Sequence, residues 1–71
     1  MKGSDFIDKI KALGKARKVD VTFDKKQGKG RNGTLYYGKS RTTVKDRKKE
    51  IGIGLLLKML ADLGLTKKDL E

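Results

Sequence analysis

The chain has 71 residues, of which 35% are hydrophobic and 39% are charged, and its formal net charge is +10. This length predicts one small domain over residues 1–71 and excludes a mononucleotide-binding α/β domain, a barrel or a two-domain enzyme. The sequence contains no Cys and no His. It therefore lacks disulfides, the usual proton shuttle near neutral pH and the commonest metal ligand. Without an apolar run that could span a membrane or a signal-peptide core after Met1, we expect a soluble, cytoplasmic protein with no metal or other cofactor.

The first predicted element is a helix over residues 4–13. Ser4 is a favourable N-cap residue, the apolar residues behind it recur at helical spacing, and Gly14 is a typical stop. From Val19 to Asp24 apolar and polar residues alternate, which predicts a half-buried strand.

Further patterns predict two more strands and a second helix. An exposed Gly-rich loop (25–33) leads to a strand (34–37), a tight reversal (38–40), a third strand (41–44) and a basic connection (45–49). A helical stripe then runs from Ile51 through Leu55 to Leu63, and the helix begins near Gly52 and Gly54. A Thr66–Asp69 capping box precedes a last turn (67–70). The order α-β-β-β-α predicts an α+β fold with a core over about residues 4–64. Two amphipathic helices would cover the one apolar face of a three-stranded antiparallel sheet.

The positive charge is concentrated in the middle of the chain. Residues 25–49 hold ten basic residues and one acidic residue, Asp46, whereas the other 46 residues hold nine basic and eight acidic residues. A local excess of +9 indicates a polyanionic ligand, most simply a phosphodiester backbone. The alternative is a solvated basic face without a dedicated ligand.

The loop and the sheet favour RNA, especially single strands. Tyr36 is predicted on the face opposite Leu35, away from the helices, where it would stack on an unpaired base while Arg41 and Thr43 contact the backbone. The predicted RNA-binding residues are Lys25, Lys26, Gly28, Lys29, Gly30, Arg31, Tyr36, Arg41, Thr43, Lys45 and Lys48. Two alternatives stay open: Tyr36 is a cross-strand packing partner of Thr43, and Lys45, Arg47, Lys48 and Lys49 belong to a solvated linker with no fixed contact.

Two glycine patterns match nucleotide-binding motifs by chance. Residues 28–33 satisfy the dinucleotide-binding pattern G-x-G-x-x-G, and residues 33–40 satisfy the Walker A pattern. Each motif needs a helix directly after its loop, whereas this sequence predicts strands there. The acidic residues are scattered and a His base is absent. The residues alone therefore predict a nucleic-acid-binding module and not an enzyme.

The segments GKGRNGTLYYG (28–38), RTTV (41–44) and KKEIGIGLL (48–56) together resemble the HicA toxins. These are small mRNA interferases of bacterial toxin–antitoxin pairs, and the resemblance spans roughly residues 4–64. It implies a double-stranded-RNA-binding-domain-like fold and ribosome- and metal-independent cleavage of mRNA, which inhibits translation and growth. It also implies neutralisation by a HicB-like antitoxin protein, which would cover the loop around Asn32 or hold the second helix through exposed apolar residues near Leu65 and Leu70.

The resemblance fails at the catalytic residue. The family's loop typically reads Gly-Lys-Gly-Ser-His-Gly with a catalytic His, whereas this chain has Arg31 at the Ser position and Asn32 at the His position. Because Asn exchanges no protons near neutral pH, a loss of about 10²–10⁴-fold in cleavage is expected. A detoxified variant, a natural copy with lost or re-routed activity, and replacement of the acid by Lys29 or Tyr36 are the three explanations.

RNA binding and antitoxin binding are implied by the resemblance whether or not the chain cleaves. The alternative function is a non-enzymatic RNA-binding module. A DNA-binding or purely structural domain is disfavoured, because no predicted helix concentrates the basic residues for insertion into a groove.

Overall fold

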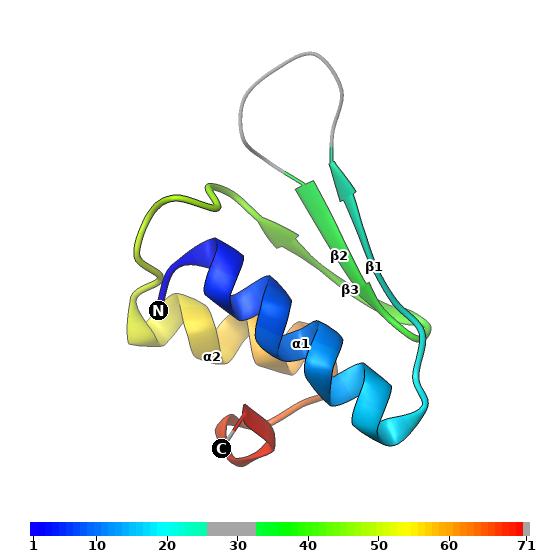
Figure 1. The fold of residues 1–71 in the computed structure, drawn as a ribbon. Coiled ribbons are helices and arrows are strands. Elements are labelled where there is room, and N and C mark those ends of the chain that lie inside the picture. Colours follow the sequence, from blue (N-terminus) through cyan, green and yellow to red (C-terminus); the bar gives the residue numbers. More distant parts are fainter. Residues whose placement is uncertain (26–32, 71) are drawn as a thin grey trace.

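The computed structural model describes residues 1–25 and 33–70. The elements are helix α1 (Gly3–Arg17), strands β1 (Val21–Lys25), β2 (Gly33–Tyr37) and β3 (Ser40–Val44), helix α2 (Ile53–Asp62) and a short 3₁₀-helix η1 (Lys67–Leu70) (Figure 1). The strands form an antiparallel sheet in the order β1-β2-β3, and both α-helices lie on the same side of it. This arrangement confirms the predicted α+β fold with the order α-β-β-β-α.

Helix α1 begins one residue before the predicted N-cap. Its N-cap residue is Lys2, whose backbone N–H donates to the Asp5 carboxylate at 3.1 Å. The backbone N–H of Ser4 donates to the carbonyl of Arg47 at 2.9 Å. The prediction of Ser4 as N-cap is therefore wrong, because Asp5 and a distant carbonyl satisfy amide groups of the first turn.

The predicted end of the first helix at Gly14 is also wrong. Helix α1 continues to Arg17 and ends at Lys18, which adopts a left-handed conformation with φ 57°. Gly14 is buried, and a Cβ there would lie 2.2 Å from Cγ2 of Val21 and 2.8 Å from the carbonyl oxygen of Val19. Glycine at this position lets the helix pack closely against the chain that enters β1.

The first strand starts at Val21, two residues later than the alternation from Val19 predicts. The backbone N–H of Val19 donates to the carbonyl of Gly14 at 2.8 Å, so this residue completes the end of α1 instead of joining the sheet. Strands β2 and β3 are joined by a two-residue turn whose first residue, Gly38, has φ +59°. Glycine at that position is the signature of a type II′ hairpin turn.

The hairpin bears out the exclusion of both glycine motifs. Gly33 opens strand β2, and Lys39 and Ser40 lie in the turn and at the start of β3. A strand therefore stands where each motif requires a phosphate-binding helix.

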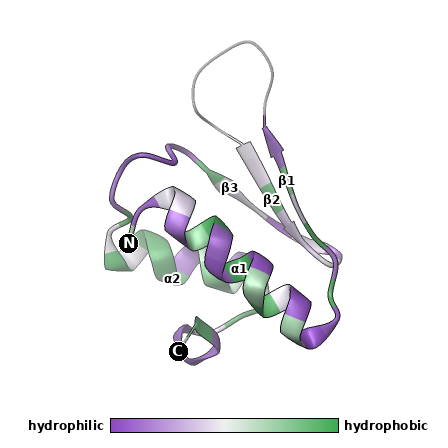
Figure 2. Cartoon of the chain, viewed as in Figure 1, coloured by the Kyte–Doolittle hydropathy of each residue, from purple (hydrophilic) through white to green (hydrophobic). Residues whose placement is uncertain are grey.

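The hydrophobic core lies between the sheet and the two helices. Its buried residues are Phe6, Ile7, Ile10, Leu35, Val44, Leu56, Met59, Leu60, Leu63 and Leu65. Helix α2 begins after its N-cap Gly52, as predicted, and is one of the most hydrophobic parts of the chain in Figure 2. Leu55 was expected in the core stripe, but its side chain is 42% exposed. No helix within residues 1–25 and 33–70 has the length and hydrophobicity to cross a membrane.

The last turn docks on the end of α1 through Asp69. As predicted, this carboxylate accepts from the backbone N–H of Thr66 at 2.7 Å and from its hydroxyl at 3.2 Å. It also pairs with the Arg17 guanidinium at 2.6 Å. The Thr66 backbone N–H and then Arg17 lower the pKa of Asp69 below its ordinary value of 3.8.

We expect this contact to make stability pH-dependent in acid. Because the pKa of Asp69 is lower in the folded chain than in the unfolded chain, its contribution is present above the unfolded pKa and is lost as the pH falls through the folded pKa. Thermal unfolding of the wild type and of Asp69→Asn over a range of pH measures this contribution to stability. The wild type should have the higher Tm at pH 7, and the two curves should converge in strong acid. A constant difference at every pH would contradict the assignment.

Candidate nucleic-acid interface

Several cations share one end of the sheet. The register pairs Gly33 with Lys25 on one side and with Val44 on the other, so β1 and β3 end where β2 begins. Lys25 and Lys45 lie at this end, and Arg47, Lys48 and Lys49 follow in the connection from β3 to α2; we call these five cations the basic end. Figure 2 shows a hydrophilic connection that leaves the end of β3 and runs to the start of α2. Among the residues the structure describes, the lysines of this group are exposed and Arg47 is half-buried.

The backbone of this connection is held against the first turn of α1. Three backbone hydrogen bonds join them: Gly3 to the carbonyl of Lys49 at 3.2 Å, Ser4 to that of Arg47 at 2.9 Å, and Ile51 to that of Met1 at 2.7 Å. A Cβ on Gly3 would lie 2.7 Å from the carbonyl oxygen of Asp46, so the two segments approach closely. The amino group of Met1 also pairs with Glu50 at 2.6 Å. The alternative of a linker with no fixed contact is therefore wrong for this backbone.

Arg47 is fixed further by an aromatic ring. Its guanidinium carbon lies 5.6 Å from the centroid of the Phe23 ring, within the range of cation–π interactions. The same ring covers Gly33, since a Cβ there would lie 2.3 Å from Cζ of Phe23. Arg47 is not among the RNA-binding residues predicted from the sequence. In the sequence nothing separates it from Lys48 and Lys49, because its contact with Phe23 arises only when β1 and the connection meet in the fold.

The open face of the sheet, away from the helices, carries the predicted aromatic residue. Tyr36 alternates with Leu35, which is fully buried against the helices. In the register Tyr36 pairs with Arg41 on β3 and Thr22 on β1. The predicted orientation of Tyr36 is therefore confirmed, and its direct neighbour on β3 is Arg41. Thr43 stands opposite Thr34 in the register and is therefore a diagonal neighbour of Tyr36 on the same face.

The structure brings the predicted RNA-binding residues together in two groups. Lys25, Lys45 and Lys48 belong to the basic end, whereas Tyr36, Arg41 and Thr43 lie on the open face. Arg41 lies in β3 and Lys45 directly follows this strand, so the two are four residues apart, a separation of about 13 Å in an extended chain. Lys26, Gly28, Lys29, Gly30, Arg31 and Asn32 lie outside the described residues.

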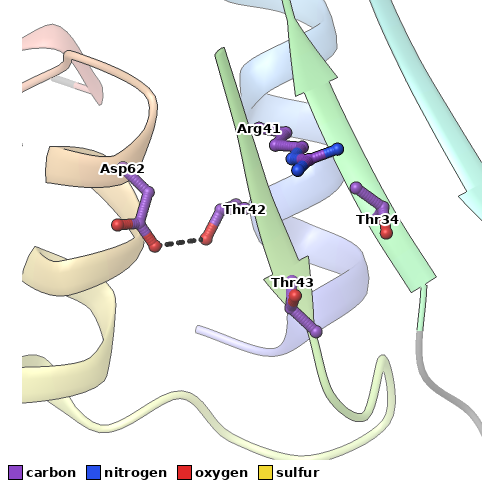
Figure 3. Close-up of a pocket in the computed structure, with 5 residues that line it drawn as sticks. All are labelled: Thr34, Arg41, Thr42, Thr43 and Asp62. Atoms are coloured by element: carbon purple, nitrogen blue, oxygen red, sulfur yellow. Dashed lines mark hydrogen bonds between the residues drawn. The ribbon is translucent and has the colours of Figure 1, made fainter.

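A polar hollow of about 410 Å³ lies beside β3 and is lined by Thr34, Arg41, Thr42, Thr43 and Asp62 (Figure 3). Thr42 is 4% exposed and faces α2, where its hydroxyl donates to Oδ2 of Asp62 at 3.0 Å. Arg41 extends from the other face of the strand, as the close-up shows. Sequence reasoning missed Asp62, which resembles any acidic residue on the solvent side of an amphipathic helix.

Helix α2 also presents apolar side chains to solvent. Ile53 is 58% exposed and Leu57 is 46% exposed. They are four residues apart and therefore share one side of the helix. The expectation of exposed apolar residues near Leu65 and Leu70 is wrong: Leu65 is a core residue and Leu70 is partly buried against the core.

The described residues of this interface offer chemical groups that can bind a ligand. Within residues 1–25 and 33–70 there is no group of three or more acidic residues that would hold a metal ion. The described groups supply cations, hydroxyls, one aromatic face and one carboxylate beside the hollow, which together suit a nucleic-acid ligand. Comparison of the chain with protein-family models, with curated proteins and with solved structures found no match.

Proposed function

We propose that this chain binds single-stranded RNA and is the toxin component of a bacterial toxin–antitoxin pair. The observation that carries RNA binding is the basic end, where cations stand on a backbone held by Gly3 and Ser4. A fixed backbone lowers the entropy lost when these side chains meet phosphates. The toxin role, the cytoplasmic location and a double-stranded-RNA-binding-domain-like fold rest on the resemblance to HicA mRNA interferases.

The open face supports a single strand as the ligand. Tyr36 offers a ring for stacking on a base, which only an unpaired base can accept, and Arg41 beside it offers a cation. Helix α1 carries both acidic and basic residues and shows no uniform basic side suited to a duplex groove. A single RNA strand that crosses the open face at Arg41 would reach Lys45 of the basic end after about 13 Å.

Salt dependence tests the binding. With about six phosphate contacts, log K against log salt for a single strand should have a slope near −4. The double substitution Lys48→Gln, Lys49→Gln should make the slope shallower by about 1.4. Fluorescence anisotropy of a labelled RNA oligonucleotide measures both.

The matched control is Lys67→Gln, Lys68→Gln, which removes the same charge from exposed residues of η1. This turn docks on the far end of α1, away from the basic end (Figure 1). The control should leave the slope nearly unchanged. An equal change in both double variants would mean that net charge alone attracts RNA, which contradicts a site at the basic end.

The chain acts as a disabled mRNA interferase under this proposal. Asn32 occupies the position of the family His and supplies no general acid or base. RNA binding persists because it depends on cations and stacking groups elsewhere. The second candidate, a non-enzymatic RNA-binding module, is favoured by the absence of His from the whole sequence. The substitution at residue 32 described in the Discussion separates the two.

The antitoxin proposed here contacts the exposed apolar side of α2. Ile53 and Leu57 provide the apolar anchors, and Lys49 precedes the helix in the connection. A partner with apolar residues inside an acidic surface would complement both features of this chain, whose net charge is +10.

Leu57→Lys should weaken binding to the protein encoded beside this chain by more than about 1 kcal/mol, because it places a charge in an apolar contact. Isothermal titration calorimetry with that protein gives the affinity. Ala12→Lys adds the same charge on an exposed site of α1 and should have little effect. Equal affinities for the wild type and Leu57→Lys would remove α2 from the interface.

A further inference from the structure

The hollow beside β3 combines a positively charged, a negatively charged and several hydroxyl side chains. Arg41 contributes a cation, Thr34 and Thr43 contribute hydroxyls from the open face, and Asp62 contributes a carboxylate from the end of α2. Its volume of about 410 Å³ is in the range of small-ligand sites. The open-face residues of the hollow adjoin Tyr36, the cross-strand neighbour of Arg41.

The carboxylate is the distinctive group of this hollow. Within the described part of the chain, Asp62 has one hydrogen-bond partner, the Thr42 hydroxyl on Oδ2, and no ion pair. Its Oδ1 is left to accept from a ligand, and the residue is exposed. A negative charge at this place opposes the approach of a phosphate backbone. In an RNA-binding site the Asp62 carboxylate would therefore accept hydrogen bonds from a base.

We infer that this hollow receives a guanine base of the bound RNA, an inference that rests on the proposed RNA-binding function. Guanine is the RNA base whose Watson–Crick edge presents two adjacent donors, N1–H and the exocyclic N2–H₂. The two oxygens of the Asp62 carboxylate accept from this pair of donors, as a carboxylate accepts from two parallel N–H groups elsewhere. The Thr42 hydroxyl orients the carboxylate from the opposite side.

The other bases fit the carboxylate less well. Adenine and cytosine present one exocyclic donor beside a ring nitrogen acceptor, and uracil presents one donor between two carbonyl oxygens. In each case an acceptor of the base would face an oxygen of Asp62, leaving polar groups unpaired. Arg41, which extends from the face of β3 opposite Thr42, donates to the neighbouring phosphate. Tyr36 stacks on the adjoining base.

A set of otherwise uridine-only RNA oligonucleotides tests the inference. One central residue is guanosine, inosine, adenosine, cytidine or uridine, and anisotropy measures the affinity for each at one salt concentration. The oligonucleotide with guanosine should bind about 5- to 100-fold more tightly than those with adenosine, cytidine or uridine. Inosine keeps N1–H and lacks the exocyclic amine, so its affinity should be intermediate.

Two matched variants identify the residue that reads the base. Asp62→Asn should abolish the preference for guanosine while affinity for uridine-only RNA stays equal or rises, because a negative charge is removed. Asp24→Asn makes the same charge change at an exposed position of β1 outside the hollow and should keep the preference. Circular dichroism of each variant verifies the fold. Thr42→Val removes the hydroxyl that holds the Asp62 carboxylate and should reduce the preference for guanosine.

The outcomes separate this inference from the proposed function. Equal affinity of the wild type for all five oligonucleotides would overturn the guanine site and leave RNA binding standing. A preference retained by Asp62→Asn would also overturn it, because the base would then be read elsewhere. Failure to bind any of the RNAs would overturn the proposed function itself.

Discussion

Replacing Asn32 by His is expected to raise cleavage of mRNA by about 10²–10⁴-fold under the proposed function, because imidazole supplies a group that transfers protons near neutral pH. Residue 32 directly precedes Gly33, the first residue of β2, in the sequence. Incubation of a long labelled mRNA with each protein in EDTA, followed by electrophoresis, measures the change.

The control for this experiment is Asn32→Gln, which keeps the amide and should cut no faster than the wild type. Anisotropy should show similar RNA affinity for all three proteins, since none of the changes alters the charge of the basic end. Equal cleavage by the wild type and Asn32→His would show that another residue transfers the proton. Binding without cleavage by either would favour the non-enzymatic RNA-binding module.

Alanine at two glycines of the helices should shift stability in opposite directions. At Gly14 a Cβ would lie 2.2 Å from Val21 and 2.8 Å from the backbone carbonyl of Val19, and a backbone atom yields less readily than the end of a side chain. We expect Gly14→Ala to lower the free energy of unfolding by about 1–3 kcal/mol through overpacking. This loss should appear although alanine favours a helix over glycine by about 1 kcal/mol.

Gly54 provides the matched comparison. It lies in the first turn of α2, and a Cβ there meets no heavy atom within 4 Å. Gly54→Ala should therefore raise the free energy of unfolding by up to about 1 kcal/mol. Urea unfolding followed by circular dichroism measures both variants. Stabilisation by Gly14→Ala would mean that α1 does not pack against the entry to β1 as the structure has it.

The periodicity of the sequence was sufficient to predict the fold class, because local spacing determines which face each residue occupies. The alternation around Leu35 predicted correctly that Tyr36 faces away from the helices. Boundaries were less predictable. Glycine is a residue type that often ends a helix, yet Gly14 lies inside α1. Its role is to allow close packing against Val21, which the tertiary fold brings next to it.

The candidate site was predictable in its chemistry and less so in its geometry. The charge count identified residues 25–49 as the source of the positive charge. It could not show that Arg47 lies over Phe23 or that Asp62 reaches Thr42, since each pair joins segments that are distant in sequence. It also could not show that Arg41 is separated from the basic end, because a count of charges does not give their positions in the fold.

The hydrogen bonds between the first turn of α1 and the connection that precedes α2 make these segments open together. The amides of Gly3, Ser4 and Ile51 each rely on a carbonyl of the other segment, so breaking the contact exposes all three to solvent at once. We expect the two segments to form one cooperative unit in hydrogen exchange, so that a ligand bound to the connection would slow exchange in the first turn of α1 as well. The spacing of the cations therefore depends on the local stability of the N-terminal helix, at the opposite end of the chain from α2.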